Sequence, residues 1–372
     1  MKMKILYLIR EDFNEIVSLA YYELVQELKS KGHEITVANL SGKFLDFPCI
    51  KINQFKFIDY PFGFVNRFFF GKAVSEQVNP KKFDLVLSSM AETLFFLSKW
   101  NILKTAVIHD NFFERAKFTP WFGKQFKLAL KVDSFFQEKA MKKADGLIFL
   151  NKNELNRMKN KTKAKCIVIH NGVNPQNFFS EEKEINKIKS KYPKKIVLFL
   201  ARIELQKNPL LFVKAAEKLQ KENAVFLIGG KGPMEKKLIK LIKEKNLLNT
   251  KFLGWIKGKE KNALINSCEI YVLPSFFEPV SVSTLEAMAC KKPVIVSDVG
   301  GLKEIVDDFV GIKFESNNSE DLAEKIKFLL DNPKKAQELG LNGFKKIKSE
   351  FLWENIAEKY INFFGELLNE RK

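Results

Sequence analysis

The chain has 372 residues, of which 46% are hydrophobic and 29% charged, with 36 phenylalanines and a formal net charge of +19. This length accommodates two domains with a sizeable core each, and the apolar content excludes wholesale disorder and a small peptide ligand. The positive charge favours phosphorylated small molecules, an anionic membrane face or nucleic acid as partners. A biased genome composition rich in Lys, Phe, Ile and Asn explains the same charge without any partner.

Short apolar runs alternate with longer segments of helical period, which predicts parallel sheets built from strand–helix–strand units. The first run is almost continuously apolar, as in a strand buried on both faces, and the helix predicted after it ends at Gly32. Six strands are predicted in the first half: Met3–Ile9, Glu34–Ala38, Leu85–Ser88, Thr105–His109, Gly146–Leu150 and Cys166–His170.

The second half repeats this alternation and ends in helices. The segment Asn174–Lys195 between the halves is polar and lysine-rich and contains two prolines, which is typical of a linker. It places the domain boundary near residues 175–193. Helices are predicted over about 319–331 and 333–347, and the amphipathic segment Phe351–Leu368 closes the chain. We therefore expect two doubly wound α/β domains, residues 1–175 and 176–350. The strands predicted in the second half are Ile196–Leu200, Ala224–Ile228, Lys251–Leu253, Ile270–Leu273, Val294–Ser297 and Gly311–Phe314.

The cysteines and the N-terminus favour a reducing compartment. Cys49, Cys166, Cys268 and Cys290 form no C-x-x-C pair, which predicts neither a zinc site nor a disulfide framework. The first apolar run meets charge too soon for a signal peptide, and no long uncharged apolar stretch follows. We expect a cytoplasmic protein, with peripheral attachment to the cytoplasmic face of a membrane as the alternative.

Doubly wound sheets bind ligands beyond the carboxyl ends of their strands, and the most distinctive motif of this chain follows a strand. After Leu273 comes a loop with Glu278, and a helix predicted to start near Ser281 carries Glu286 one to two turns inside it. The two carboxylates can face one crevice and accept hydrogen bonds from polyols such as a ribose and a hexose. The helix N-terminus between them suits phosphate. A polyol, a phosphate and a second polyol are the parts of a nucleotide sugar.

Two further loops also follow predicted strands. Arg202 and Lys207 form a basic pair on the loop after Ile196–Leu200, where two cations can bind a diphosphate and stabilise negative charge as it leaves. Such a pair in isolation is more often a solvated surface pair. Gly230 and Gly232 follow the next strand and permit close approach of the backbone.

Taken in order, these motifs resemble the donor half of the retaining glycosyltransferases of family four (group 1 glycosyl transferases). The motifs are Arg202…Lys207, Gly230–Pro233, Glu278…Glu286 and Pro293–Ile305. Weaker similarity extends upstream, so that the resemblance covers almost the whole chain. The upstream segments are Lys31–Val37, Val107–Asp110 and Ile169–Asn174.

The resemblance implies the GT-B fold, with two Rossmann-like domains that face a cleft and a C-terminal helix, 351–372, that crosses back to the first domain. It implies transfer of a hexose from a nucleoside-diphosphate sugar to an acceptor hydroxyl, with retention of anomeric configuration. It implies neither a cofactor nor a required metal, and the chain has no D-x-D triplet of the kind that holds a cation in the alternative GT-A architecture. The acceptor class includes glycans and lipid-linked sugars.

The resemblance also assigns residue roles. Arg202 and Lys207 would hold the diphosphate, and Glu286 the ribose hydroxyls. Glu278 would meet the donor hexose together with the N–H groups near Val280 and Ser281, and Gly230 and Gly232 would belong to the donor site. His109 would contact the donor sugar or position the acceptor, with a satisfied core imidazole as the structural alternative.

Three departures from the family pattern leave other functions open. Ser281 and Lys291 stand where the family usually has glycine, and Arg10–Ile16 stands where it has a glycine-rich turn. The alternatives are a degenerate domain that binds nucleotide or membrane without transfer, and a nucleotide-sugar epimerase of the same fold. The Phe- and Lys-rich segments Phe55–Lys72 and Asn111–Lys143 suit either a core or an anionic membrane surface. No nucleic-acid-binding signature occurs, so nucleic acid is not expected as a partner.

Overall fold

The computed structural model describes residues 2–9, 17–54, 63–109 and 123–371. Its contacts divide the chain into two compact units: Met1–Asn171 with Trp353–Lys372, and Gly172–Leu352. The boundary between Asn171 and Gly172 falls just before the segment that the sequence favours as a linker. The C-terminal segment Trp353–Lys372 belongs to the first unit. In the described part of the chain, no helix has the length and apolar character needed to cross a membrane.

The first unit is built on a seven-stranded parallel sheet of order β3-β2-β1-β4-β5-β6-β7. Every side chain of the inner strands β4 and β5 is buried, which accounts for their largely apolar sequence. The buried Lys104 of β5 pairs with Asp145 over 3.2 Å. The six expected strands are present. The strands are β1 (Lys4–Leu8), β2 (Glu34–Asn39), β3 (Cys49–Lys51), β4 (Leu85–Ser88), β5 (Leu103–Ile108), β6 (Gly146–Phe149) and β7 (Lys165–Val168).

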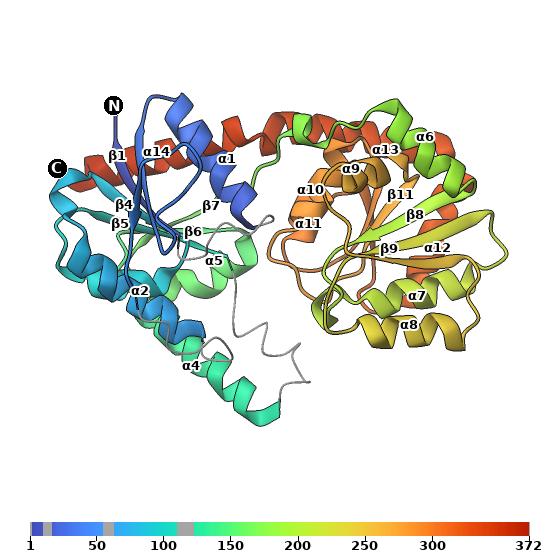
Figure 1. Cartoon of the computed structure of the whole chain (residues 1–372), viewed down its shortest axis with the longest axis horizontal. Helices are drawn as coiled ribbons and strands as arrows, with labels where there is room; N and C mark the ends of the chain where they lie inside the picture. Colours follow the sequence, from blue (N-terminus) through green and yellow to red (C-terminus); the bar gives the residue numbers. More distant parts are fainter. Residues whose placement is uncertain (1, 10–16, 55–62, 110–122, 372) are drawn as a thin grey trace. The chain divides into compact units, whose positions relative to one another are not determined.

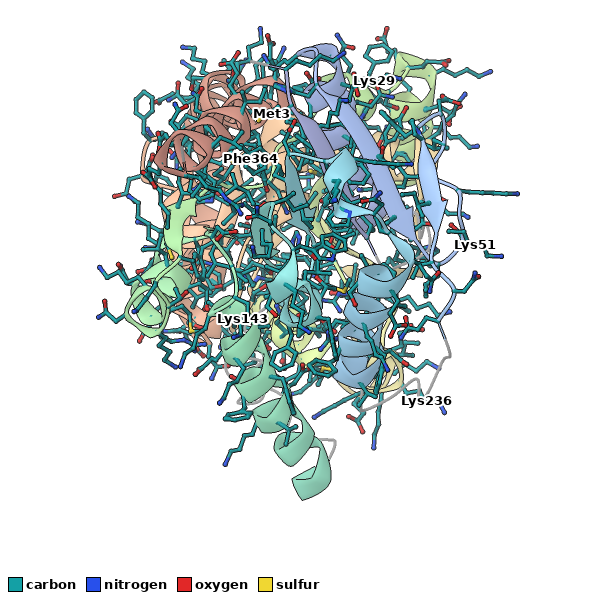
Figure 2. All side chains as sticks on the ribbon, turned by 90° about the vertical axis from the view of Figure 1, so that its left-hand side faces the viewer. Met3, Lys29, Lys51, Lys143, Lys236 and Phe364 are labelled. Carbon is teal, nitrogen blue, oxygen red and sulfur yellow. The ribbon has the colours of Figure 1, made fainter. Side chains whose placement is uncertain are left out.

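Helices cover both faces of this sheet: α1 and α14 lie on one face, and α2 and α4 on the other (Figure 1). The C-terminal helix α14 packs along α1 and buries a stripe that includes Ile356, Tyr360 and Phe364. Figure 2, which faces this unit, shows Phe364 inside and Lys51 and Lys143 at the surface. The helices are α1 (Val17–Ser30), α2 (Gly63–Gln77), η1 (Pro80–Lys82), η2 (Ala91–Lys99), α4 (Gly123–Met141), α5 (Lys152–Met158), η4 (Lys159–Lys161) and α14 (Trp353–Arg371).

The second unit has a six-stranded parallel sheet of order β10-β9-β8-β11-β12-β13. All six strands expected in this half are present, and the core consists largely of their Val, Ile, Leu and Phe side chains. The strands are β8 (Lys195–Leu200), β9 (Ala224–Gly229), β10 (Thr250–Gly254), β11 (Ile270–Leu273), β12 (Val294–Ser297) and β13 (Gly311–Phe314).

In this unit, α7, α8 and α12 cover one face of the sheet, and α6, α9, α10 and α13 cover the other (Figure 1). Both halves of the chain are therefore doubly wound, as the sequence predicts. The helices are η5 (Pro175–Phe178), α6 (Glu182–Lys191), η6 (Leu205–Lys207), α7 (Pro209–Lys218), α8 (Glu235–Glu244), α9 (Gly258–Ser267), α10 (Val282–Ala289), α11 (Leu302–Ile305), α12 (Ser319–Asp331), α13 (Pro333–Lys346) and η7 (Ile347–Phe351).

The interpretation of Asn174–Lys195 as a linker is wrong. This segment contains η5 and α6, and α6 packs against α9 within the second unit. Ile188 and Tyr192 pack on the core of this unit, while the other side chains of α6 are mostly charged. Because α6 consists mostly of Lys and Glu, its composition resembles that of a linker although the segment forms an amphipathic surface helix.

Candidate donor site

The candidate site of the second unit lies where the strand order reverses. β8 and β11 are neighbours in the sheet although β9 and β10 separate them in sequence. The loops after β8 and β11 therefore start side by side at the carboxyl edge, where doubly wound sheets bind ligands. The first loop carries Arg202 and Lys207, and the second carries Glu278.

Glu278 is 3% exposed, and two side chains hold its carboxylate. Lys207 Nζ forms an ion pair with Glu278 Oε2, and Ser275 Oγ donates a hydrogen bond of 3.2 Å to the same oxygen. Gln206 Nε2 also donates to the Phe277 carbonyl oxygen over 3.0 Å, which ties the two loops together. The structure therefore brings Lys207 and Glu278, both predicted as site residues, into direct contact.

Arg202 differs from Lys207 in exposure and in partner. Its Nη2 lies 2.9 Å from Glu204 Oε1, and its side chain is 55% exposed, whereas that of Lys207 is 12% exposed. The Arg202 side of this pair is exposed, so the guanidinium group is accessible to a ligand, whereas the Glu204 side chain is only 19% exposed. Lys207, in contrast, must give up its ion pair with the buried carboxylate of Glu278 before it can bind a new partner.

Gly230 and Gly232 let the loops after β8 and β9 touch backbone to backbone. Gly230 has φ of +146°, and a Cβ atom there would lie 1.9 Å from the Ala201 carbonyl oxygen. A Cβ atom on Gly232 would lie 2.4 Å from the Ile203 carbonyl oxygen. The Ile203 N–H donates to the Lys231 carbonyl oxygen over 3.0 Å. The close approach expected of these glycines thus occurs within the protein and fixes the loop that carries Arg202.

The N-terminus of α10 lies directly after the loop with Glu278. Ser281 is the N-cap, and its Oγ accepts a hydrogen bond of 3.1 Å from the Thr284 N–H. Val280, one residue earlier, packs against the core of the unit. The first N–H groups of a helix have no intrahelical acceptor, so this end of α10 presents donors and a positive dipole end.

Tyr271 on β11 is a buried residue of this site that the sequence analysis did not single out. Its hydroxyl lies 2.7 Å from Ser283 Oγ and 3.1 Å from the Leu200 carbonyl oxygen. Burial raises the pKa of Tyr271, and the negative charges of Glu286 and Glu278 raise it further. Both carboxylates are therefore close enough to act on one hydroxyl, which stays protonated.

Glu286, on α10, is 5% exposed and pairs with a lysine that the sequence analysis missed. Lys261 Nζ on α9 lies 2.6 Å from Glu286 Oε2. Burial raises the pKa of Glu286, and the Lys261 charge acts in the opposite direction. Lys261 stands in a run of charged residues, Lys257–Lys261, and nothing in that run distinguishes it from solvated neighbours.

His109 lies in the first unit, directly after β5. Its Nε2 atom is buried and has no hydrogen-bond partner among the described residues, and its ring meets the edge of Tyr21 with centroids 5.4 Å apart. Burial lowers the pKa of His109 to about 4, so the imidazole is neutral near pH 7. Among the described residues, this side chain thus has one buried ring nitrogen without a hydrogen-bond partner.

Two family models together match almost the whole chain. The description of the first is "Glycosyl transferases group 1", over residues 180–346, and that of the second is "Glycosyltransferase Family 4", over residues 17–177. The chain belongs to the family-four glycosyltransferases. The first model covers all the second-unit side chains described above, and the second covers His109.

Two relatives are about one-third identical to the chain over somewhat more than half of its length. An uncharacterized glycosyltransferase of Methanocaldococcus jannaschii is 32% identical over 57% of this chain and 57% of its own length. The N,N'-diacetylbacillosaminyl-diphospho-undecaprenol alpha-1,3-N-acetylgalactosaminyltransferase of Campylobacter jejuni is 31% identical over 62% of each protein. The chain thus spans between half and two thirds of the length of these relatives.

Solved glycosyltransferases with the GT-B fold have the same architecture. Sucrose-phosphate synthase from Thermosynechococcus elongatus superposes with a TM-score of 0.82 at 20% identity, over 99% of this chain and 100% of that one. HepE of Anabaena in complex with UDP and glucose superposes with a TM-score of 0.76 at 18% identity, over 98% and 100%. At this identity the likeness establishes the fold, which is GT-B as the sequence predicts.

The structure accounts for two departures from the usual family pattern. Ser281 has an extended backbone that serine adopts without strain, and it caps α10. Lys291 follows the end of α10 with φ of +59°, the left-handed conformation that glycine adopts at lower cost. The third departure, Arg10–Ile16, lies outside the described residues, as does Asp110.

Proposed function

We propose that this family-four protein transfers a hexose from a nucleoside-diphosphate sugar to an acceptor hydroxyl, with retention of anomeric configuration. The observation that carries this proposal is the set of charges around the N-terminus of α10: the Lys207–Glu278 pair, Glu286, and the exposed Arg202. Two buried carboxylates suit two polyols, and two cations with a helix N-terminus suit the diphosphate between them. HepE, with the same fold, was solved with UDP and glucose bound.

Each charge has a separate task in this proposal. Arg202 and Lys207 hold the diphosphate with the Val280 and Ser281 region of α10, and Glu286 accepts hydrogen bonds from the ribose hydroxyls. Glu278 accepts from the hexose hydroxyls, and Gly230 and Gly232 hold the Arg202 loop in register. Donor binding exchanges the Lys207–Glu278 pair for contacts of Lys207 with phosphate and of Glu278 with sugar.

The reaction breaks the bond between the anomeric carbon and the phosphate oxygen and forms a bond from that carbon to the acceptor oxygen on the same face of the sugar. The acceptor hydroxyl gives up its proton, which the departing diphosphate accepts. Negative charge develops on the departing diphosphate. Preorganised cations in a water-poor site stabilise such charge, and removal of one such group typically lowers turnover by about 100- to 1000-fold. We therefore propose that no metal ion or other cofactor is required.

The acceptor is proposed to be a glycan or a lipid-linked sugar. The relative from C. jejuni is named for a diphospho-undecaprenol acceptor. His109 is the proposed hydrogen-bonding group of the first unit, because its Nε2 is buried without a partner in the described chain and its imidazole is neutral. It would bind a hydroxyl of the transferred sugar or of the acceptor.

We also propose peripheral contact of the first unit with an anionic membrane. A cluster of phenylalanines from α2, η2 and α4 is half-buried except for the exposed Phe135, and Arg67 joins the same three elements by pairing with Glu92 and Asp133. Phe135 is 55% exposed, with Lys139 over its ring at 5.3 Å. Both figures show α4 extending beyond the rest of its unit. The cluster is Phe68, Phe69, Phe95, Phe96, Phe135 and Phe136.

Thermal stabilisation by UDP, GDP and ADP in the presence of a chelator tests the donor site. One nucleotide should stabilise the wild type, by about 2.7 kcal/mol at 100 times its dissociation constant. The stabilisation should be lost in Glu286→Ala because the ribose hydroxyls lose their acceptor.

Each other outcome of this test contradicts a definite part of the proposal. No stabilisation by any nucleotide would favour a degenerate domain without a donor. Stabilisation that survives in Glu286→Ala would remove Glu286 from the ribose site. A separate assay with a nucleotide sugar tests the epimerase alternative, because an epimerase would change the sugar and leave it attached to the nucleotide.

A further inference from the structure

We propose that Lys261 is a positioning residue for Glu286 and thereby determines the preference of the site for ribonucleotides over nucleotides without ribose hydroxyls. The inference rests on the proposed function, in which Glu286 binds the ribose. Lys261 Nζ lies 2.6 Å from Glu286 Oε2, and this oxygen is buried with no other partner in the described chain. The pair therefore fixes one carboxylate oxygen and leaves Oε1 to accept from a ligand.

Lys261 is itself held in place by the ring of Phe178, which is in turn tied to helix α9. Its Nζ lies over the ring of Phe178 at 5.6 Å from the centroid, and its side chain is 26% exposed. Asn266, on the same helix α9, donates a hydrogen bond of 2.8 Å to the Phe178 carbonyl oxygen. Because α9 and η5 are joined in this way, the ammonium group is preorganised against Glu286 before any ligand binds.

The pair also keeps Glu286 in the form that accepts hydrogen bonds. A carboxylate accepts from both hydroxyls of a ribose, whereas a protonated carboxyl group is itself a donor. Burial raises the pKa of Glu286, and Lys261 opposes this effect. The other titratable groups beside Glu286 are Tyr271 and Cys290. Burial raises the pKa of Tyr271, and it raises the pKa of Cys290 to about 12, so both groups are neutral near pH 7.

Removal of the Lys261 charge should therefore weaken binding of the ribose in particular. Lys261→Met keeps the length of the side chain and its contact with Phe178. We expect the affinity for UDP, GDP or ADP, whichever the wild type binds, to fall about tenfold or more. The affinity for the 2′,3′-dideoxy form of that nucleotide should hardly change. Because the pKa of Glu286 rises without Lys261, the loss should grow as pH is lowered.

The experiment measures both affinities by calorimetry for the wild type, Lys261→Met, Lys261→Arg, Glu286→Gln and the double variant. Lys261→Arg should restore part of the preference, and Lys261→Met should add little in the Glu286→Gln background. Lys259→Met, at an exposed position of the same helix, is the matched control and should behave like the wild type.

The outcomes separate this inference from the proposed function. If the wild type prefers the ribonucleotide and Glu286→Gln abolishes the preference, but Lys261→Met keeps it, then Lys261 does not position Glu286. If Lys261→Met is less stable to heat but keeps the preference for the ribonucleotide, Lys261 contributes only to the stability of the fold. If the wild type shows no preference at all, the ribose site is wrong, and the inference falls with it.

Discussion

Lys291, the second residue after α10, shows how closely the backbone is packed beside the site. It adopts a left-handed conformation, and its carbonyl oxygen faces Gly340 on α13. A Cβ atom on Gly340 would lie 2.2 Å from that oxygen. The end of α10 therefore has a fixed position because a helix with a glycine at this point packs against it.

Gly340→Ala should lower the free energy of unfolding by about 1–3 kcal/mol, because the added methyl group forces α13 away from Lys291. Gly343→Ala on the same helix is the matched control. Its Cβ atom would meet Met288 at an ordinary contact distance of 3.4 Å, and alanine favours helix by about 0.5–1 kcal/mol. Denaturant titration of both variants measures the difference. Equal changes in the free energy of unfolding for the two variants would show that α13 shifts at Gly340 without cost.

Site residues differ in how far the sequence can reveal them. Glu278 and Lys207 stand after strands in recognisable motifs, and the structure joins them because β8 and β11 are neighbours. Lys261 has no such motif, since its role depends on the rotation of α9 and on its distance from Glu286. Pairing across elements of this kind depends on tertiary packing, which local patterns do not encode.

At the scale of elements, apolar runs predicted almost every strand because parallel strands are buried on both faces. β3 was missed because its three residues are too few to form a run, and only pairing with β2 makes them a strand. α6 was taken for a linker because composition outweighed its weak apolar stripe. Periodicity thus identifies elements with a large buried face and fails for short or mostly charged ones.

The surface formed by α2, η2 and α4 should bind anionic vesicles. Lys139, which lies over the ring of the exposed Phe135, attracts the lipid charge, and Phe135 can enter the interface. Phe135→Ser should weaken sedimentation with anionic vesicles several-fold, whereas Phe179→Ser, at a more exposed site of the second unit, should not. High salt should weaken binding of the wild type. Equal sedimentation with neutral and anionic vesicles would exclude this membrane contact.

At the scale of the whole molecule, the proposed donor groups all belong to the second unit, and His109 belongs to the first. The second unit is one continuous segment, while the first is closed by the C-terminal helix α14. The family resemblance predicted the fold over almost the whole chain and the donor motifs in its second half, whereas the acceptor and the nucleotide base have no comparable motif. Loops that bind acceptors vary more than the sheets that carry them.

The most direct test is sugar transfer from UDP-, GDP- and ADP-hexoses, with chelator present, followed by NMR of the first-formed product. The wild type should form a glycosidic bond of the same anomeric configuration as the donor. Lys207→Met should lower kcat by about 100-fold or more, because the departing diphosphate loses a cation, while Lys214→Met, exposed on α7, should not. A product of inverted configuration, dependence on added metal, or full activity of Lys207→Met would contradict the account.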